Sequence, residues 1–142
     1  MLIAGQDIPA HIIKQGSFEE IDLALLSIDQ NRLPVSLLLR RNPLCTQSSR
    51  VGEEVIDVIP EETTRAQIIS RFLIPVELRK KFRTLITNPQ RSGSGIFDAK
   101  RKCLVGIMSA KVSKRRYVIS HGHLMTTADG YAGYFVPAAT IA

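Results

Sequence analysis

Ser92 is the residue of this chain with the clearest chemical potential, because a serine hydroxyl becomes a nucleophile when a neighbouring base takes its proton. It stands in the run Gln90–Gly95, Gln-Arg-Ser-Gly-Ser-Gly, between apolar segments. Such a nucleophile also needs N–H donors for the oxyanion that forms during acyl transfer. Without a base and donors, Ser92 is an ordinary turn serine. Which interpretation holds depends on the secondary-structure elements that position Ser92.

The composition is that of one ordinary globular domain. The chain has 142 residues, of which 44% are hydrophobic and 23% charged, enough to bury a real core. It contains no apolar stretch long enough to span a membrane. The first residues lack the basic start and apolar core of a signal peptide, so we expect a cytoplasmic chain. Cys45 and Cys103 are too few for a disulfide framework. We expect buried or semi-buried thiols, and the sequence leaves open whether they pair.

The chain is basic, with a formal net charge of +6 and a pI near 9.7. Aromatic residues do not interleave with the basic clusters, as base stacking would require. The pattern therefore favours solvated turns over a nucleic-acid interface. The clusters are Arg40-Arg41, Arg79-Lys80-Lys81-Arg83, Lys100-Arg101-Lys102 and Lys111-Lys114-Arg115-Arg116.

Most of the sequence consists of short apolar segments separated by turn residues, which predicts an all-β chain. Residues 41–50 are polar and indicate a linker. Residues 51–136 predict an antiparallel barrel of about six strands, and residues 76–82 have some helical character. The strand-like segments are 8–14, 21–29, 33–40, 53–59, 66–74, 81–87, 103–110, 115–120 and 132–136.

The sequence around Ser92 does not fit the α/β-hydrolase elbow, which reads G-x-S-x-G between a strand and a helix. Instead "NPQRSGSGIFD" (88–98), followed by "LVGIMS" (104–109), resembles the nucleophile region of trypsin-like serine peptidases. It looks closest to bacterial HtrA-type and glutamyl endopeptidase-type members. Further segments resemble the family in its own order: "GQDIPAHII" (5–13), "DLALLSID" (22–29), "VGEEVIDVIP" (51–60) and "GYFVP" (133–137).

The resemblance implies a trypsin-like double β-barrel in which the first barrel is incomplete. Residues 1–44 would form the partial N-terminal barrel, and residues 45–142 the C-terminal barrel that carries the nucleophile loop. Ser92 matches the nucleophile, and Asp22 matches the aspartate that orients the catalytic histidine. In such a triad the serine attacks, the histidine carries the proton and the aspartate holds the imidazole.

The resemblance also assigns residues around the nucleophile. The backbone N–H groups of Gln90 and Ser92 match the oxyanion hole. The strand that lines the primary specificity pocket matches Ser109, Ala110 and Lys111. Lys111 is a hint of a preference for an acidic side chain. A polypeptide substrate or peptide ligand is therefore the expected partner.

The catalytic histidine is missing from its expected place. His11 lies in the segment just before Asp22, which is the wrong element, and His121 and His123 follow Ser92. His11 as a displaced base remains an alternative. His121 and His123 could share a metal, but no third ligand is evident. We therefore predict no metal and no cofactor. Gln90 also stands where the family has glycine.

Arg91 stands where the family usually has Asn or Asp. The missing histidine and the changes at positions 90 and 91 leave three hypotheses open. The chain is a fragment or degenerate copy of a serine endopeptidase, inactive alone. Alternatively, it is a pseudoprotease that binds a peptide or partner. Thirdly, it is one subunit of a split protease, to which a second chain supplies the missing strands and histidine. The family's members are often periplasmic or secreted.

Overall fold

The computed structural model divides into two compact units, Met1–Pro43 and Leu44–Ala142. It describes residues 1–3, 5–39 and 42–141, and for residues 114–116 and 127–130 it describes the backbone alone. Strands dominate both units and the few helices are one turn long. The prediction of an all-β chain is therefore confirmed.

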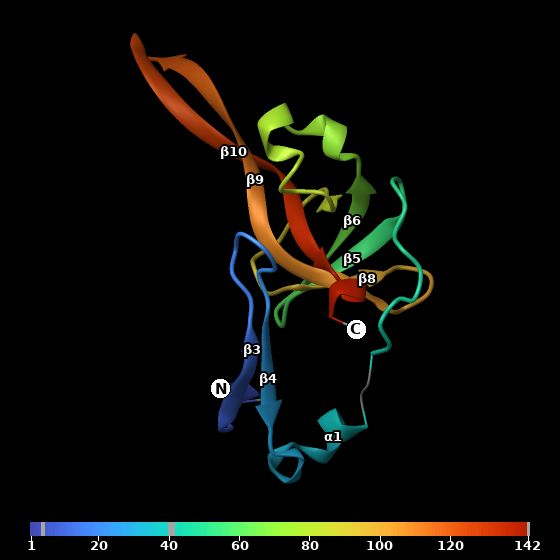
Figure 1. Cartoon of the computed structure of the whole chain (residues 1–142). Helices are drawn as coiled ribbons and strands as arrows, with labels where there is room; N and C mark the ends of the chain where they lie inside the picture. The colour runs from blue at the N-terminus through green and yellow to red at the C-terminus, as the bar shows by residue number, and fades with distance from the viewer. Residues whose placement is uncertain (4, 40–41, 142) are drawn as a thin grey trace. The chain divides into compact units, whose positions relative to one another are not determined.

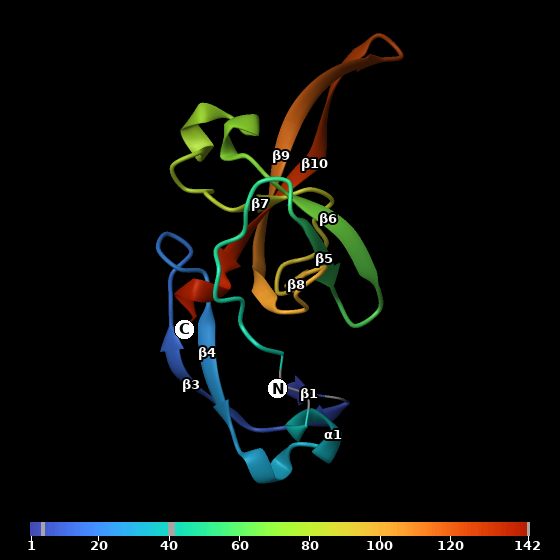
Figure 2. The same cartoon turned by 90° about the vertical axis from the view of Figure 1, so that its right-hand side faces the viewer.

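Six antiparallel strands of the second unit close into a barrel in the order β10-β7-β6-β5-β8-β9, as Figure 1 and Figure 2 show from two sides. This confirms the expected barrel of about six strands. The strands are β5 (Glu54–Val58), β6 (Thr63–Ile69), β7 (Leu85–Ile86), β8 (Gly95–Asp98), β9 (Leu104–Ser120) and β10 (His123–Pro137).

The barrel interior follows from the two-residue period of its strands. In β5 the inward residues are Val55 and Asp57, and in β6 they are Ala66 and Ile68, all of them buried. Asp57 is the exception in this pattern because it brings a carboxylate into the interior. The core cluster consists of Val55, Ala66, Ile68, Ile86, Ile96, Val105, Met108 and Phe135.

The segment between β6 and β7 forms the 3₁₀ turns η2 (Arg71–Leu73) and η3 (Val76–Leu78). It packs Ile74 and Phe82 against Leu85 and two residues of the β9–β10 hairpin, Val112 and Ala132. The helical character expected over residues 76–82 thus appears as a single 3₁₀ turn. The strand expected over residues 66–74 ends at Ile69.

β9 and β10 form one long hairpin that extends beyond the barrel (Figures 1 and 2). Residues 103–110 and 115–120 were expected as separate strands, but residues 104–120 form the single strand β9. His121 and Gly122 join the two strands with φ angles of 51° and 77°. Two consecutive positive φ values are the signature of the type I′ turn, which matches strand twist.

The first unit contains two small sheets. β1 (Leu2–Ile3) pairs with β2 (Gln6–Asp7), and β3 (Ala10–Gln15) pairs with β4 (Ala24–Ile28). The 3₁₀ turn η1 (Gln30–Arg32) and the helical turn α1 (Val35–Leu38) follow.

The strand expected over residues 33–40 is wrong for the described part of that segment. The carbonyl of Pro34 accepts hydrogen bonds from the N–H groups of Leu37 and Leu38 at 2.9 and 3.3 Å. Proline suits the start of a helix because its ring fixes φ. The apolar run therefore coils after Pro34 instead of extending.

A disulfide joins Cys45 to Cys103 across 58 residues. The sequence left open whether these two cysteines pair, and the structure joins them. The N–H of Cys45 also donates to the carbonyl of Leu104 at 2.9 Å. The two links fix the start of the second unit to the beginning of β9. A 3₁₀ turn, η4 (Ala138–Thr140), follows β10.

Candidate functional site

Ser92 lies in the loop between β7 and β8, on the surface of the barrel. The N–H of Gly93 donates to the carbonyl of Met108 at 2.8 Å, and the N–H of Met108 donates back to the carbonyl of Ser94 at 2.9 Å. Gly93 has a φ of 88°, a conformation that glycine adopts without steric cost. The loop is thereby pinned to β9, and Ser92 is exposed at its turn.

The backbone N–H of Gln90, predicted as an oxyanion donor, makes a hydrogen bond of 2.8 Å to Oδ2 of Asp57. The Gln90 side chain adds bonds from Nε2 to the Asp57 carbonyl at 3.1 Å and to Oγ1 of Thr64 at 2.9 Å. This N–H therefore serves a carboxylate of the barrel interior. An oxyanion at the same donor would have to displace the Asp57 side chain from this hydrogen bond.

Asp57 is fully buried, and its second oxygen, Oδ1, has no hydrogen-bond partner within the described residues. The same is true of Oε1 of Gln90 and Oγ of Ser94. Buried polar atoms usually find partners, so this cluster beneath the loop is unusual. Sequence reasoning missed Asp57. The segment 55–58 reads Val-Ile-Asp-Val, and the sequence gives no signal that Asp57, instead of its apolar neighbours Ile56 and Val58, faces the barrel interior.

Arg91 and Glu61 tie the loop to the turn between β5 and β6. Nη2 of Arg91 lies 2.6 and 2.8 Å from the two carboxylate oxygens of Glu61. The hydrogen bond from Arg91 lowers the pKa of the Glu61 carboxyl. Arg91 therefore has a local structural partner in Glu61.

A shallow depression of about 380 Å³ lies beside this loop. It includes Gln90 and Arg91 but not Ser92. Its lining combines apolar side chains with polar and charged ones. The lining residues are Ile59, Glu62, Thr64, Asn88, Pro89, Gln90 and Arg91.

The three residues predicted for the specificity pocket follow Met108 on β9. Ser109 is buried, Ala110 is half-buried and Lys111 is exposed. Ala110 pairs with Tyr134 and Lys111 with Gly133 of β10. Because Met108 bonds to both Gly93 and Ser94, the loop and this part of β9 are neighbours. The predicted role of these three residues stays a prediction.

Asp22, the predicted orienting aspartate, belongs to the other unit, just before β4. His11 lies in the same unit, on β3 opposite Ser27, and is exposed. Within the described residues, no hydrogen bond joins an imidazole to Ser92. A histidine side chain does form a hydrogen bond elsewhere, between Nδ1 of His121 and Oγ of Ser120 at 3.0 Å. The triad therefore stays a prediction.

His121 lies in the turn of the long hairpin and His123 begins β10, and both are exposed. Across residues 1–3, 5–39 and 42–141, no group of three or more His, Cys, Asp or Glu is arranged to hold a metal ion. No helix of the described chain is both long and apolar enough to cross a membrane.

Comparison of the chain with protein-family models, with curated proteins and with solved structures found no match. The resemblance to trypsin-like peptidases therefore rests on the segments quoted above.

Proposed function

We propose that this chain is a degenerate trypsin-like serine endopeptidase domain that does not hydrolyse peptide bonds on its own. The second unit would be its C-terminal barrel, with Ser92 on the nucleophile loop, and the first unit would be part of the N-terminal barrel. The closed six-stranded antiparallel barrel and the loop between β7 and β8 support this assignment. The hydrogen bond from the Gln90 N–H to Asp57 carries the proposal of inactivity.

In an active relative, the serine oxygen would attack the scissile carbonyl while the histidine takes its proton. Here the Gln90 N–H is engaged by a carboxylate, and loss of one oxyanion donor costs about 10²–10³ in rate. Asp22 cannot replace the base, because in a triad it acts on the serine through the imidazole. Ser92 is then left with the ordinary, low nucleophilicity of a hydroxyl.

The test is labelling of the whole chain with a fluorophosphonate probe, with Ser92→Ala as the site variant and Ser113→Ala as the matched exposed serine. We expect no labelling of any of the three and no peptide hydrolysis above background. Labelling that disappears in Ser92→Ala but persists in Ser113→Ala would overturn the inactive assignment. If it also disappeared in His11→Ala, His11 would be the displaced base.

A second candidate is peptide binding without hydrolysis, which the depression beside Gln90 and Arg91 favours. Lys111 is exposed on the neighbouring β9 and would attract an acidic side chain. Titration with an acidic peptide and with its amidated, neutral counterpart tests this role. Lys111→Glu should weaken binding of the acidic peptide and leave binding of the neutral peptide unchanged. Equal binding of both peptides to both proteins would contradict it.

Complementation by a second chain is favoured by the burial pattern of the first unit. Among its described hydrophobic residues, Ile8 is the buried one, whereas Ile12, Ile13, Leu25 and Leu26 on β3 and β4 are exposed. A two-stranded sheet of this kind is marginal alone. Further strands, with a histidine, would cover it. The coding sequence on both sides of this chain is the direct test: an apolar strand and a Thr-Ala-x-His-like segment in a neighbouring frame would support a split protease, and their absence would contradict it.

A further inference from the structure

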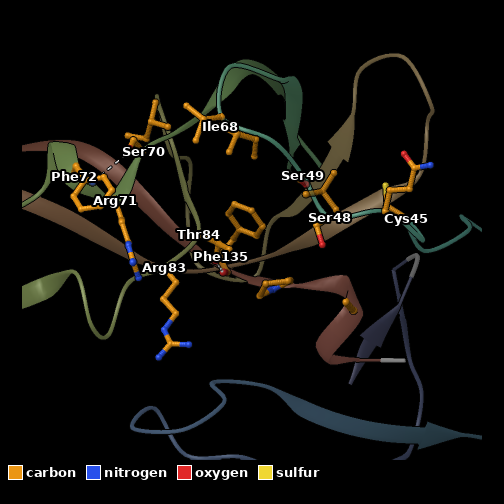
Figure 3. Close-up of a pocket in the computed structure, with 16 residues that line it drawn as sticks. Cys45, Ser48, Ser49, Ile68, Ser70, Arg71, Phe72, Arg83, Thr84 and Phe135 are labelled. Atoms are coloured by element: carbon orange, nitrogen blue, oxygen red, sulfur yellow. Dashed lines mark hydrogen bonds between the residues drawn. The ribbon is translucent and has the colours of Figure 1, made fainter.

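A second cavity of the barrel unit, of about 360 Å³, shares no lining residue with the depression beside Ser92. This volume lies within the range of small-molecule sites. Figure 3 shows the residues around it. They come from residues 45–51, the end of β6, the segment before β7, parts of β9 and β10, and η4. All of them belong to the unit Leu44–Ala142.

The floor of this cavity is apolar. It is lined by three residues of the core cluster, Ile68, Val105 and Phe135. Pro137 and the disulfide-bonded Cys45 also line it. One of the hydroxyls that line the cavity is already engaged, since Thr84 donates to the carbonyl of Phe135. Such a floor excludes a small, fully hydrated ion as the best occupant. It suits a hydrocarbon body.

The charged side chains that line the cavity are two arginines, Arg71 and Arg83, and its lining contains no Asp or Glu. The Arg71 guanidinium lies 5.5 Å from the ring centroid of Phe72, and Nε of Arg83 donates to the carbonyl of Lys80 at 3.4 Å. Within the described residues neither arginine is within ion-pair distance of a carboxylate. Their forks match the two oxygens of a carboxylate.

The hydroxyls at the rim add donors of hydrogen bonds. Oγ of Ser70 accepts from the N–H of Phe72 at 3.2 Å, which leaves its own O–H to donate. In the view of Figure 3, Arg71 and Arg83 stand at one end of the cavity, and Cys45, Ser48 and Ser49 at the other. The cavity is therefore cationic at one end and apolar along its floor.

We propose that this cavity binds a small organic carboxylate with an apolar body, such as a medium-chain acyl or aryl carboxylate. Its head group lies between Arg71 and Arg83, and its hydrocarbon lies along Ile68, Val105 and Phe135. The site is independent of the proposed peptidase ancestry, because none of its residues belongs to the Ser92 loop.

Isothermal titration of the full chain separates the contribution of the carboxylate charge from that of the hydrocarbon. Octanoate, kept below its micelle concentration, carries both. Octanol has the same hydrocarbon without the charge, and acetate has the same charge without the hydrocarbon. Octanoate should bind at least about tenfold more tightly than either. Equal binding of octanoate and octanol would overturn the proposal, because it would reveal an uncharged apolar trap. So would equal binding of octanoate and acetate.

Variants locate the site. The double variant R71Q/R83Q should weaken octanoate by about tenfold or more, and its octanol affinity should stay the same. The control R32Q/R65Q loses the same two charges at exposed ion pairs with Asp29 and Glu54 and should bind octanoate as the parent does. Ser49→Trp, which fills the cavity, should abolish binding with both arginines present. Unchanged octanoate affinity in R71Q/R83Q or in Ser49→Trp, with circular dichroism unchanged, would overturn the proposal.

Discussion

At the turn between β8 and β9, the Asp98 carboxylate accepts several hydrogen bonds at once. Its Oδ1 accepts the backbone N–H groups of Lys100 and Arg101 at 2.9 and 2.6 Å, and its Oδ2 accepts Nε of Arg101 at 2.9 Å. Burial by itself raises the pKa of this carboxyl. The hydrogen bonds from Arg101 and Lys100 outweigh that effect, so the pKa of Asp98 is lowered from its ordinary value of 3.8. The ionised form is therefore stabilised in the folded protein.

Asp98→Asn should lower the free energy of unfolding at neutral pH by about 2 kcal/mol, the usual contribution of hydrogen bonds to a charged group. A lowered folded pKa gives stability that is complete above the ordinary value and is lost as the pH falls below it. The difference between parent and variant should therefore shrink below pH 3.8. Urea unfolding at several pH values measures it, with exposed Asp7→Asn as control. A pH-independent difference would contradict the argument.

At the scale of elements, the outer half of the β9–β10 hairpin is the least buried part of the second unit. Tyr117, Ile119 and Leu124 are exposed by 71%, 76% and 70%, and Val118 and Met125 are also exposed. Opposed residues of an antiparallel pair share a face. Ile119 opposes Leu124, and Val118 opposes Met125. Both faces of the ribbon are therefore apolar near its turn.

Replacing residues 117–126 by Asn-Gly should leave the barrel intact. The new turn would join Arg116 to Thr127, which already face each other in register, and Asn-Gly favours the same type I′ turn. Because the removed side chains lie outside both core clusters, we expect the free energy of unfolding to change by less than about 1 kcal/mol. Urea unfolding and near-ultraviolet circular dichroism measure this. A loss of several kcal/mol would mean that the outer hairpin packs on the barrel.

At the scale of the whole molecule, long-range links hold the second unit together. The disulfide closes a separation of 58 residues, and disulfides persist mainly in oxidising compartments. The pairing therefore favours such a compartment over the cytoplasmic location that the first residues suggested.

Reduction of this disulfide, or the double variant C45A/C103A, should lower the free energy of unfolding. On the loop-entropy account, a disulfide over this separation lowers the entropy of the unfolded chain and stabilises the folded protein by up to about 4 kcal/mol. Thermal unfolding with and without a reductant measures the effect. The double variant should no longer respond to the reductant. Equal melting temperatures of the oxidised and reduced parent would argue against a structural disulfide.

The two units should also differ in their solution behaviour. The second unit has two buried core clusters, whereas the first exposes Leu25 and Leu39 and leaves Leu23 and Leu37 only half-buried. Uncovered apolar strands promote association. We expect the full chain to self-associate in sedimentation, and to do so more strongly than a chain of residues 44–142, which keeps the exposed apolar residues of the outer β9–β10 hairpin. A monomeric full chain at high concentration would contradict this.

The sequence by itself determined the elements whose signal is local. The short apolar runs of residues 53–59 and 66–74, bounded by turn residues, predict strands because segments of that length and composition are typical of buried strands. Turn residues around them predict an all-β barrel. The strand expected over residues 33–40 failed because an apolar run alone does not distinguish an extended segment from a helical turn, and Pro34 decided the outcome.

Only the tertiary structure decided the features that join distant residues. The pairing of Cys45 with Cys103 and the bond from Gln90 to Asp57, 33 residues away, depend on how the barrel closes. So does the cavity beneath Arg71 and Arg83, whose lining comes from several separate segments. Local periodicity specifies which face of a strand is buried. It does not specify which strand becomes its neighbour, because that choice is made by packing across the whole barrel.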